Sequence, residues 1–208
     1  MTREGRVGAW DRLVDVVIDP AAAFQGIGAR PVWGVAFVAL VALRFGSVLA
    51  FYQPDTNAAK LVTGVLFQVV TLIPLIAILA TVLRVAAAVW RAGLTWPGAW
   101  SLTTHVMFAY TLATVAVASV AGALLPESAD VDLRSPPFTN LGSLISDVQS
   151  PLLHALATEA DIRSMYAAVL VWIGVRAASD ARGGVAARIV ATCFAAAAFA
   201  AAGSALLR

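Results

Sequence analysis

Long apolar stretches, interrupted by segments that carry most of the arginines, constrain this chain more than any other feature of its sequence. Of its 208 residues, 61% are hydrophobic and 12% are charged, whereas soluble globular chains are about 45–50% apolar and about 25% charged. A water-soluble domain of this length could not bury so much apolar surface, but the hydrocarbon interior of a bilayer solvates it. The sequence therefore predicts an all-α, polytopic (multi-pass) membrane protein.

Five of these stretches are predicted to cross the membrane as a helical bundle that makes up residues 32–208. The second contains Pro74 near its centre, where the missing backbone donor predicts a kink. The fourth is short, because only Ser164–Val175 is free of charge and rises about 18 Å, against a hydrocarbon core of about 30 Å. We expect Arg163 and Arg176, at its ends, to extend toward the membrane surfaces and so lengthen it. The predicted spans comprise residues 32–52, 61–83, 99–125, 162–178 and 185–207.

Residues 1–31 precede the first span and are predicted to form an amphipathic segment on the cytoplasmic side. Asp19 and Pro20 are expected to end one helix and begin another, with Asp19 as the N-cap and Pro20 in the first turn. The second short helix would carry Phe24 and Ile27. A cleavable signal peptide is not expected, since charged residues interrupt the segment throughout. The first helix is predicted to lie on the membrane surface or against the bundle, because apolar residues recur in it at helical spacing: Val7, Trp10, Leu13, Val14, Val17 and Ile18.

The distribution of Lys and Arg predicts the orientation of the chain, because cytoplasmic segments carry an excess of both residues. With a cytoplasmic N-terminus and an external C-terminus, nine arginines lie in inner segments and four Lys or Arg in outer segments, which leaves Arg44 inside the first span. The acidic loop of residues 126–161 then faces outside. These charges form no continuous basic face in the predicted layout, and nucleic-acid binding is therefore not expected. The inner residues are Arg3, Arg6, Arg12, Arg30, Arg84, Arg91, Arg176, Arg182 and Arg188, and the outer ones are Lys60, Arg134, Arg163 and Arg208.

Arg44 is the most informative single residue, because it is predicted to lie about 18 Å from the inner end of the first span. An arginine at the centre of a bilayer costs about 2.5–3.5 kcal/mol on insertion scales, so it needs a partner or a wet cavity. Asp161 and Glu159, at the outer end of the fourth span, are candidate partners, as are Gln68 and backbone carbonyl groups. Two interpretations stay open: an internal tether between the first and fourth spans, or a polar cavity that binds an anionic headgroup or solute.

The sequence contains no motif that we recognise as catalytic or cofactor-binding. His105 is predicted to lie about two turns into the third span from the cytoplasm and His154 in the outer loop, so they cannot share a metal ion. We expect His105 to hydrogen-bond to a neighbouring helix. Cys193, the single cysteine, is expected to be a small packing residue, with acylation or an intermolecular thiol as alternatives. The sequence thus predicts neither an enzyme nor a cofactor or metal site.

Two segments of the chain resemble the Yip (Ypt-interacting protein) family of small five-span membrane proteins, in its bacterial branch. Asp19, Pro20, Phe24 and Ile27 form an Asp-Pro-x-x-x-Phe-x-x-Ile stretch before the first span. The second segment, around the fourth span, contains Glu159–Ile162, Met165–Tyr166 and Trp172–Val175. The resemblance covers essentially the whole layout and implies five helices and a cytoplasmic N-terminus, here in a bacterial inner membrane. It does not imply binding of the Rab-type GTPases that eukaryotic members engage, because the Asp-Leu-Tyr-Gly-Pro stretch of that branch is absent.

Two hypotheses on function follow. The first is a non-enzymatic scaffold or accessory subunit that interacts with lipids, with other membrane proteins or with itself. It is motivated by small residues on the third and fifth spans, such as Ala118, Gly122 and Ala195–Ala198, which allow helices to approach closely. The alternative is a small transporter or channel with a polar cavity around Arg44 and a kink at Pro74. It is weakened because the predicted spans contain no Asp or Glu to carry ions and no inverted repeat.

Overall fold

The computed structural model describes residues 8–50, 58–124, 153, 157 and 161–206. Within these ranges the chain forms α-helices and no β-strand, as the sequence predicts. The helices, in chain order, are α1 (Ala9–Ile18), α2 (Pro20–Ala29), α3 (Gly34–Ala50), α4 (Ala58–Val89), α5 (Trp96–Leu124), α7 (Ile162–Ser179) and α8 (Gly183–Leu206).

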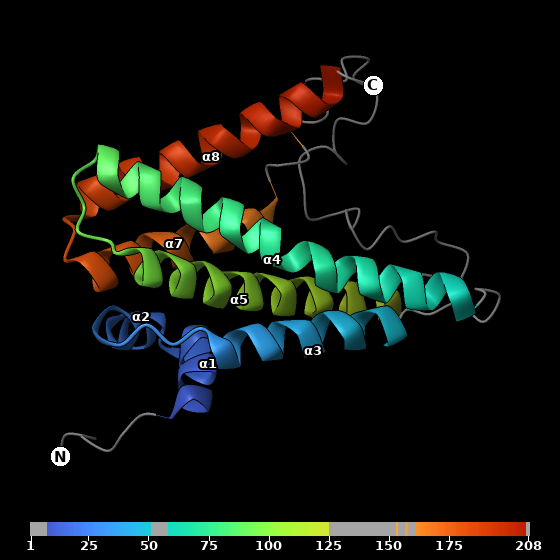
Figure 1. The fold of residues 1–208 in the computed structure, drawn as a ribbon. Coiled ribbons are helices and arrows are strands. Elements are labelled where there is room, and N and C mark those ends of the chain that lie inside the picture. The colour runs from blue at the N-terminus through green and yellow to red at the C-terminus, as the bar shows by residue number, and fades with distance from the viewer. Residues whose placement is uncertain (1–7, 51–57, 125–152, 154–156, 158–160, 207–208) are drawn as a thin grey trace.

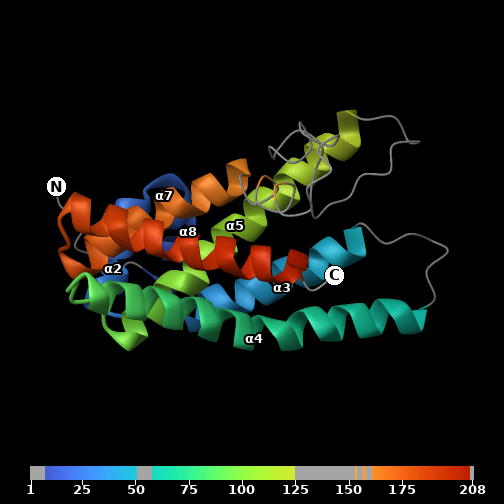
Figure 2. The same ribbon diagram turned by 90° about the horizontal axis from the view of Figure 1, so that it is seen from above.

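The helix α5 is the centre of the bundle and packs against α3, α4 and α7. In Figure 1 α3 and α4 run in the same general direction as α5, whereas α8 starts beside α4 and α7 and then diverges from them. Figure 2 shows the C-terminal part of α5 diverging from α4. Short helix α2, the connection from α4 to α5 and the connection from α7 to α8 gather at one end of the bundle (Figure 1). The C-terminal end of α8 and the N-terminal end of α4 lie at the opposite end.

Three helices are long and apolar enough to cross a membrane, over Val62–Val89, Trp96–Val120 and Gly183–Ala200. The apolar part of α3, Gly34–Leu49, is shorter. The helix α7 has 18 residues and carries Arg163 and Arg176, and it is not among the three. The prediction of an all-α protein is confirmed for the described residues, and the three long apolar helices support the prediction of a protein embedded in a membrane. The count of five crossings stays a prediction.

The helix α4 is longer than the predicted second span. It continues through Arg84 to Val89, beyond the predicted end at Leu83, because arginine is a good helix former and its long side chain can reach the membrane surface. The chain leaves the helical conformation at Arg91, whose φ is 55°. Pro74 lies inside this helix, which is continuous on both sides of it.

The helix α5 begins at Trp96 rather than at residue 99, where the sequence places it. The Oγ1 atom of Thr95 accepts a hydrogen bond of 3.2 Å from the backbone N–H of Gly98, which satisfies one of the free donors at the helix start. Pro97 occupies the first turn, where its missing N–H costs nothing. These local signals start the helix about one turn before the predicted start of the third span.

The helix α2 forms as the sequence predicts. The side chain of Asp19 accepts a hydrogen bond of 3.2 Å from the backbone N–H of Ala22, and Pro20 is the first helical residue. Phe24 and Ile27 lie one turn apart and are fully buried. The motif before the first span is thus an N-cap followed by an anchoring apolar face.

The helix α1 lies across the bundle rather than along it (Figure 1). It buries Leu13 and Val16, of which Val16 does not belong to the predicted stripe. Arg12 Nη1 donates a hydrogen bond of 3.0 Å to the carbonyl oxygen of Arg30 and so ties α1 to the end of α2. One edge of α1 therefore packs on the protein, while an apolar face is directed outward, as in a helix that lies on a membrane surface. The exposed apolar residues of this face are Trp10, Val14, Val17 and Ile18.

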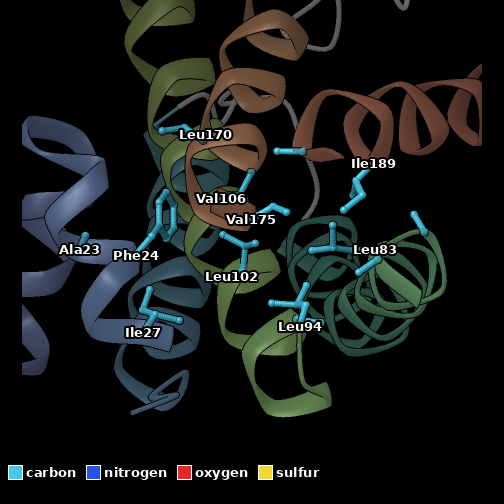
Figure 3. Packing of buried hydrophobic residues seen from close by; sticks show 14 of the residues in the cluster. Ala23, Phe24, Ile27, Leu83, Leu94, Leu102, Val106, Leu170, Val175 and Ile189 are labelled. Atoms are coloured by element: carbon cyan, nitrogen blue, oxygen red, sulfur yellow. The ribbon is translucent and has the colours of Figure 1, made fainter. Parts of the chain in front are cut away.

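The main apolar core, which we call the end core, lies where α2, α4, α5, α7 and α8 meet (Figure 3). A Cβ atom on Gly28 would lie 2.8 Å from the Cα atom of Ala178, and a Cβ atom on Gly174 would overlap Leu102. Glycine at these positions lets α2 and α5 approach α7 closely. The larger members of the end core are Val16, Phe24, Ile27, Leu83, Leu94, Leu102, Val106, Leu170, Val175 and Ile189.

Candidate functional site

A cavity of about 480 Å³ lies between α3, α4, α5 and α7, a volume in the range of small-molecule sites. We call it the polar cavity, because charged and polar side chains dominate its lining. The sequence singles out Arg44 and Gln68, and the structure brings both to this cavity. The polar lining residues are Arg44, Ser47, Gln68, Tyr110, Thr111, Thr114 and Arg163, and the apolar ones are Val48, Val115 and Ala118.

Arg44 comes from the C-terminal half of α3. The carbonyl oxygen of Arg44 accepts a hydrogen bond of 2.8 Å from Ser47 Oγ, within the same helix. Its Nε atom is buried and has no hydrogen-bond partner among the residues that the structure describes. An internal tether from Arg44 to Asp161 is not what the structure shows, because the carboxylate of Asp161 is paired with Arg163. Of the two interpretations of Arg44, its position favours the polar cavity.

Arg163 makes a buried ion pair at the start of α7. Asp161 is the N-cap of this helix, and its Oδ1 atom accepts a hydrogen bond of 2.8 Å from the backbone N–H of Arg163. Its Oδ2 atom accepts from Arg163 Nε at 2.7 Å and also from Arg163 Nη2. Both side chains are only 4% exposed, and the Cζ atom of Arg163 lies 6.0 Å from the ring centroid of Tyr110.

The expectation that Arg163 extends toward the membrane surface is therefore wrong. The N-cap geometry places the carboxylate of Asp161 beside the guanidinium group, so the side chain turns into the bundle, where its charge has a partner. Glu159, the second acidic candidate, lies outside the described residues.

One face of α5 supplies the floor of the cavity, with Thr111, Thr114, Val115 and Ala118 at helical spacing. Thr114 Oγ1 donates a hydrogen bond of 2.8 Å to the carbonyl oxygen of Tyr110. Thr111 is 4% exposed, and its Oγ1 atom has no partner among the described residues. Thr111 is not among the site residues that the sequence predicts. The available signal was the recurrence of hydroxyl and small side chains on one face of an otherwise apolar helix.

His105 lies in α5 closer to the end core and does not line the polar cavity. It is 2% exposed, and its Nδ1 atom lies 2.7 Å from the carbonyl oxygen of Ser101 in the same helix. The expected bond to a neighbouring helix is thus replaced by one to its own helix. Among the described residues no group of three His, Cys, Asp or Glu could hold a metal ion. His154 lies outside these residues, and Cys193 is half-buried against the end core.

The described lining offers guanidinium groups, hydroxyl groups and one side-chain amide from four helices. Such groups hold and orient a ligand through hydrogen bonds and charge. Arg44 Nε and Thr111 Oγ1 have no hydrogen-bond partner among the described residues. These two donors are therefore available to a ligand. In comparisons with known proteins, no family model, no curated protein and no solved structure matches this chain.

Proposed function

We propose that this chain is a non-enzymatic membrane protein that acts by binding, as an accessory or scaffold component, and that its polar cavity holds the ligand. The observation that carries the proposal is the pair of buried donors, Arg44 Nε and Thr111 Oγ1, that find no partner among the described residues around the cavity. Native proteins rarely leave buried polar atoms unpaired, and those that do so often leave them for a ligand, an ion or water.

We propose five crossings, with α3 and α7 as the two beyond the three long apolar helices. The 18 residues of α7 rise about 27 Å, close to the hydrocarbon thickness of about 30 Å. Near the start of α7 the charged side chain of Arg163 does not face lipid, because it is paired with Asp161 within the bundle. At its other end the Cζ atom of Arg176 lies 4.7 Å from the ring centroid of Trp172. Its outward side is apolar at Ile162, Met165 and Val169, and that of α3 at Val38, Phe45 and Leu49.

The orientation in this proposal has the N-terminus and the α7–α8 turn in the cytoplasm and the C-terminus outside a bacterial inner membrane. Labelling of single cysteines with a membrane-impermeant reagent tests it, in a Cys193→Ala background. Gly8→Cys and Arg182→Cys, both at exposed positions, should react only after the cells are opened. A C-terminal tag should be accessible in intact cells. Reaction of Arg182→Cys in intact cells would remove α7 as a crossing.

The resemblance to the bacterial Yip branch remains part of the proposal. Its support is local: Asp19 and Pro20 start α2, and Phe24 and Ile27 form the buried face of that helix. These contacts give the motif a structural reason, namely to fix α2 at the end of the bundle where α1 meets the membrane surface.

The binding role is tested by purifying the full-length chain in mild detergent and identifying what remains bound by native mass spectrometry. We expect a lipid, a solute or a partner protein to be retained reproducibly by the wild-type chain. A clean, ligand-free monomer in mild detergent, which is also not stabilised by any added lipid or solute, would contradict the proposed binding role.

A small transporter is the second candidate, and the polar cavity between α3, α4, α5 and α7 favours it. A cavity in the middle of a bundle can receive a solute from one side and release it to the other if the helices rearrange. Flux of an anionic solute into proteoliposomes that contain the wild-type chain, and its loss in Arg44→Ala, would support transport. Equal flux in protein-free liposomes would show that the chain does not transport that solute.

A further inference from the structure

We infer that the polar cavity binds a phosphate-type oxyanion, which the guanidinium group of Arg44 and the hydroxyl group of Thr111 hold between α3 and α5. This inference rests on the proposed binding role and names the chemical class of the ligand. The same chemistry is offered by the phosphate of an anionic lipid headgroup and by a dissolved phosphate.

The charge of the cavity favours an anion. Its described lining contains two arginines and no carboxylate, and the carboxylate of Asp161 pairs with one of these arginines, Arg163. That carboxylate bonds to Arg163 through Nε and Nη2. The positive charge of Arg44 is thus left without a paired carboxylate among the described residues, in a setting where a charge away from water needs a counter-charge.

The hydrogen-bond donors point to the same conclusion. Most threonines whose bonds the structure describes donate to the carbonyl oxygen four residues earlier, as Ser and Thr side chains in helices commonly do. Thr111 does not, although it is 4% exposed and lines the cavity. Its hydroxyl group and Arg44 Nε are therefore two donors, from two helices, that remain available for one acceptor group. The threonines that donate within their own helices are Thr63, Thr71, Thr81, Thr104, Thr114 and Thr192.

The shape of the donor set favours a phosphate over a carboxylate. A guanidinium group presents two parallel N–H donors that match the oxygens of either anion. Thr111 adds a donor from a second helix, and a tetrahedral group with three or four oxygens can accept from both the fork and this further donor. A cavity of about 480 Å³ admits such a group with substituents.

The surroundings of the cavity are compatible with a lipid as the source. Phe45 and Leu49 follow Arg44 and Val48 on α3 and are exposed on the outside of the bundle, as are Leu66 and Phe67 next to Gln68 on α4. Acyl chains lying on these side chains would leave the headgroup within reach of the cavity. A dissolved phosphate needs only the cavity itself, so the two sources are separable by experiment.

The experiment measures ligand-dependent thermal stability of the full-length chain in nanodiscs. One arm compares discs of phosphatidylcholine with discs that also contain phosphatidylglycerol, and the other adds inorganic phosphate to phosphatidylcholine discs. We expect the midpoint of unfolding to rise in at least one arm, with an apparent affinity at least about tenfold weaker in Arg44→Gln, since one charge-assisted hydrogen bond is worth about that factor. A rise with phosphatidylglycerol alone identifies a lipid headgroup, and a rise with inorganic phosphate identifies a dissolved anion.

Matched variants keep the test valid if Arg44→Gln does not fold. Thr111→Val preserves shape and should weaken binding about three- to tenfold. Thr104→Val removes an equally buried hydroxyl from the same helix, and Arg84→Gln removes a charge from α4; neither side chain lines the cavity, and both variants should bind within twofold of the wild type. Arg44→Lys should keep part of the affinity, because it retains the charge without the fork.

Three results would overturn the inference. The first is no stabilisation in either arm, and the second is equal stabilisation in the wild type, Arg44→Gln and Thr111→Val. Retention of a neutral molecule that Thr111→Val releases would also overturn it while leaving the proposed binding role intact. Loss of every ligand in mild detergent would contradict both the inference and the proposed binding role. The failure of the inference alone is therefore distinguishable from the failure of the proposed function.

Discussion

The two halves of α5 lie in contrasting surroundings. Toward its N-terminal end, Leu102 and Val106 belong to the end core, where Gly174 and Gly28 let neighbouring helices approach closely. Further along, Thr111 and Thr114 face a cavity that holds charge and unmatched donors. Close packing in the end core fixes the helices relative to one another. Looser packing further along α5 leaves space for a binding site. Substitutions in the end core should therefore lower stability, whereas substitutions of unpartnered cavity residues should not.

The largest expected effect is in the end core. Phe24→Ala removes a fully buried aromatic ring that α2 inserts into the core and should lower the free energy of unfolding by about 3–5 kcal/mol. Phe24→Leu keeps most of the volume and should cost less than about 2 kcal/mol. Unfolding followed by circular dichroism in mild detergent measures both. Equal stability of the two variants would mean that α2 is not part of the folding core.

The next effect comes from the one buried ion pair that the described residues show. Asp161→Asn keeps an N-cap for α7 but removes the charge that Asp161 contributes to its buried ion pair with Arg163, at a cost of about 3 kcal/mol. Asp180→Asn is the control, since Asp180 is exposed with a φ of 51°, which asparagine tolerates. The same unfolding assay compares them. If both variants are as stable as the wild type, the Asp161–Arg163 pair does not hold α7 in place.

A smaller loss is expected where α2 approaches α7. In Gly28→Ala the new Cβ atom would meet backbone atoms of Ala178 at 2.8 and 3.2 Å. The two helices must then separate, which should lower the free energy of unfolding by about 1–3 kcal/mol. Gly46→Ala is the matched control, because nothing lies within 4 Å of a Cβ atom there. The control should be neutral or stabilising by up to about 1 kcal/mol. A neutral Gly28→Ala would show that the two helices are not in tight contact.

The smallest effect, and one of opposite sign, is expected in the polar cavity. Thr111→Val removes a buried hydroxyl group that has no partner among the described residues and should raise the stability of the ligand-free chain by up to about 1 kcal/mol. Thr104→Val, which loses a hydrogen bond of 2.8 Å to the carbonyl oxygen of Trp100, should lower it by a similar amount. Thermal unfolding in detergent without added anion compares the two. If Thr111→Val is less stable than the wild type, the hydroxyl group of Thr111 makes a hydrogen bond within the folded chain, which would contradict this prediction.

Local signals in the sequence were enough to predict α2. Asp19, Pro20 and the spacing of Phe24 and Ile27 act within one short helix, so no distant contact is needed to interpret them. The placement of Arg44 inside an apolar helix was equally predictable, because hydropathy depends on composition alone.

The partners of the charged residues were not predictable in the same way. Whether Asp161 pairs with Arg44 or with Arg163 depends on the direction in which the N-cap of α7 points its carboxylate, which a sequence spacing does not specify. The orientation of Thr111 depends on how α3 and α5 are rotated against each other. The end of α4 at Val89 differs from the predicted end at Leu83 because a helix can continue past a charged residue such as Arg84.

The stability of Arg44→Leu tests most directly whether Arg44 belongs to a binding site or acts as an internal tether. The midpoint of thermal unfolding of the ligand-free, full-length chain should be equal to or above that of the wild type, because Arg44 loses no ion pair among the described residues and a buried charge is removed. A loss corresponding to about 3 kcal/mol or more, with little folded protein recovered, would instead show that Arg44 holds the helices together, and would contradict the account.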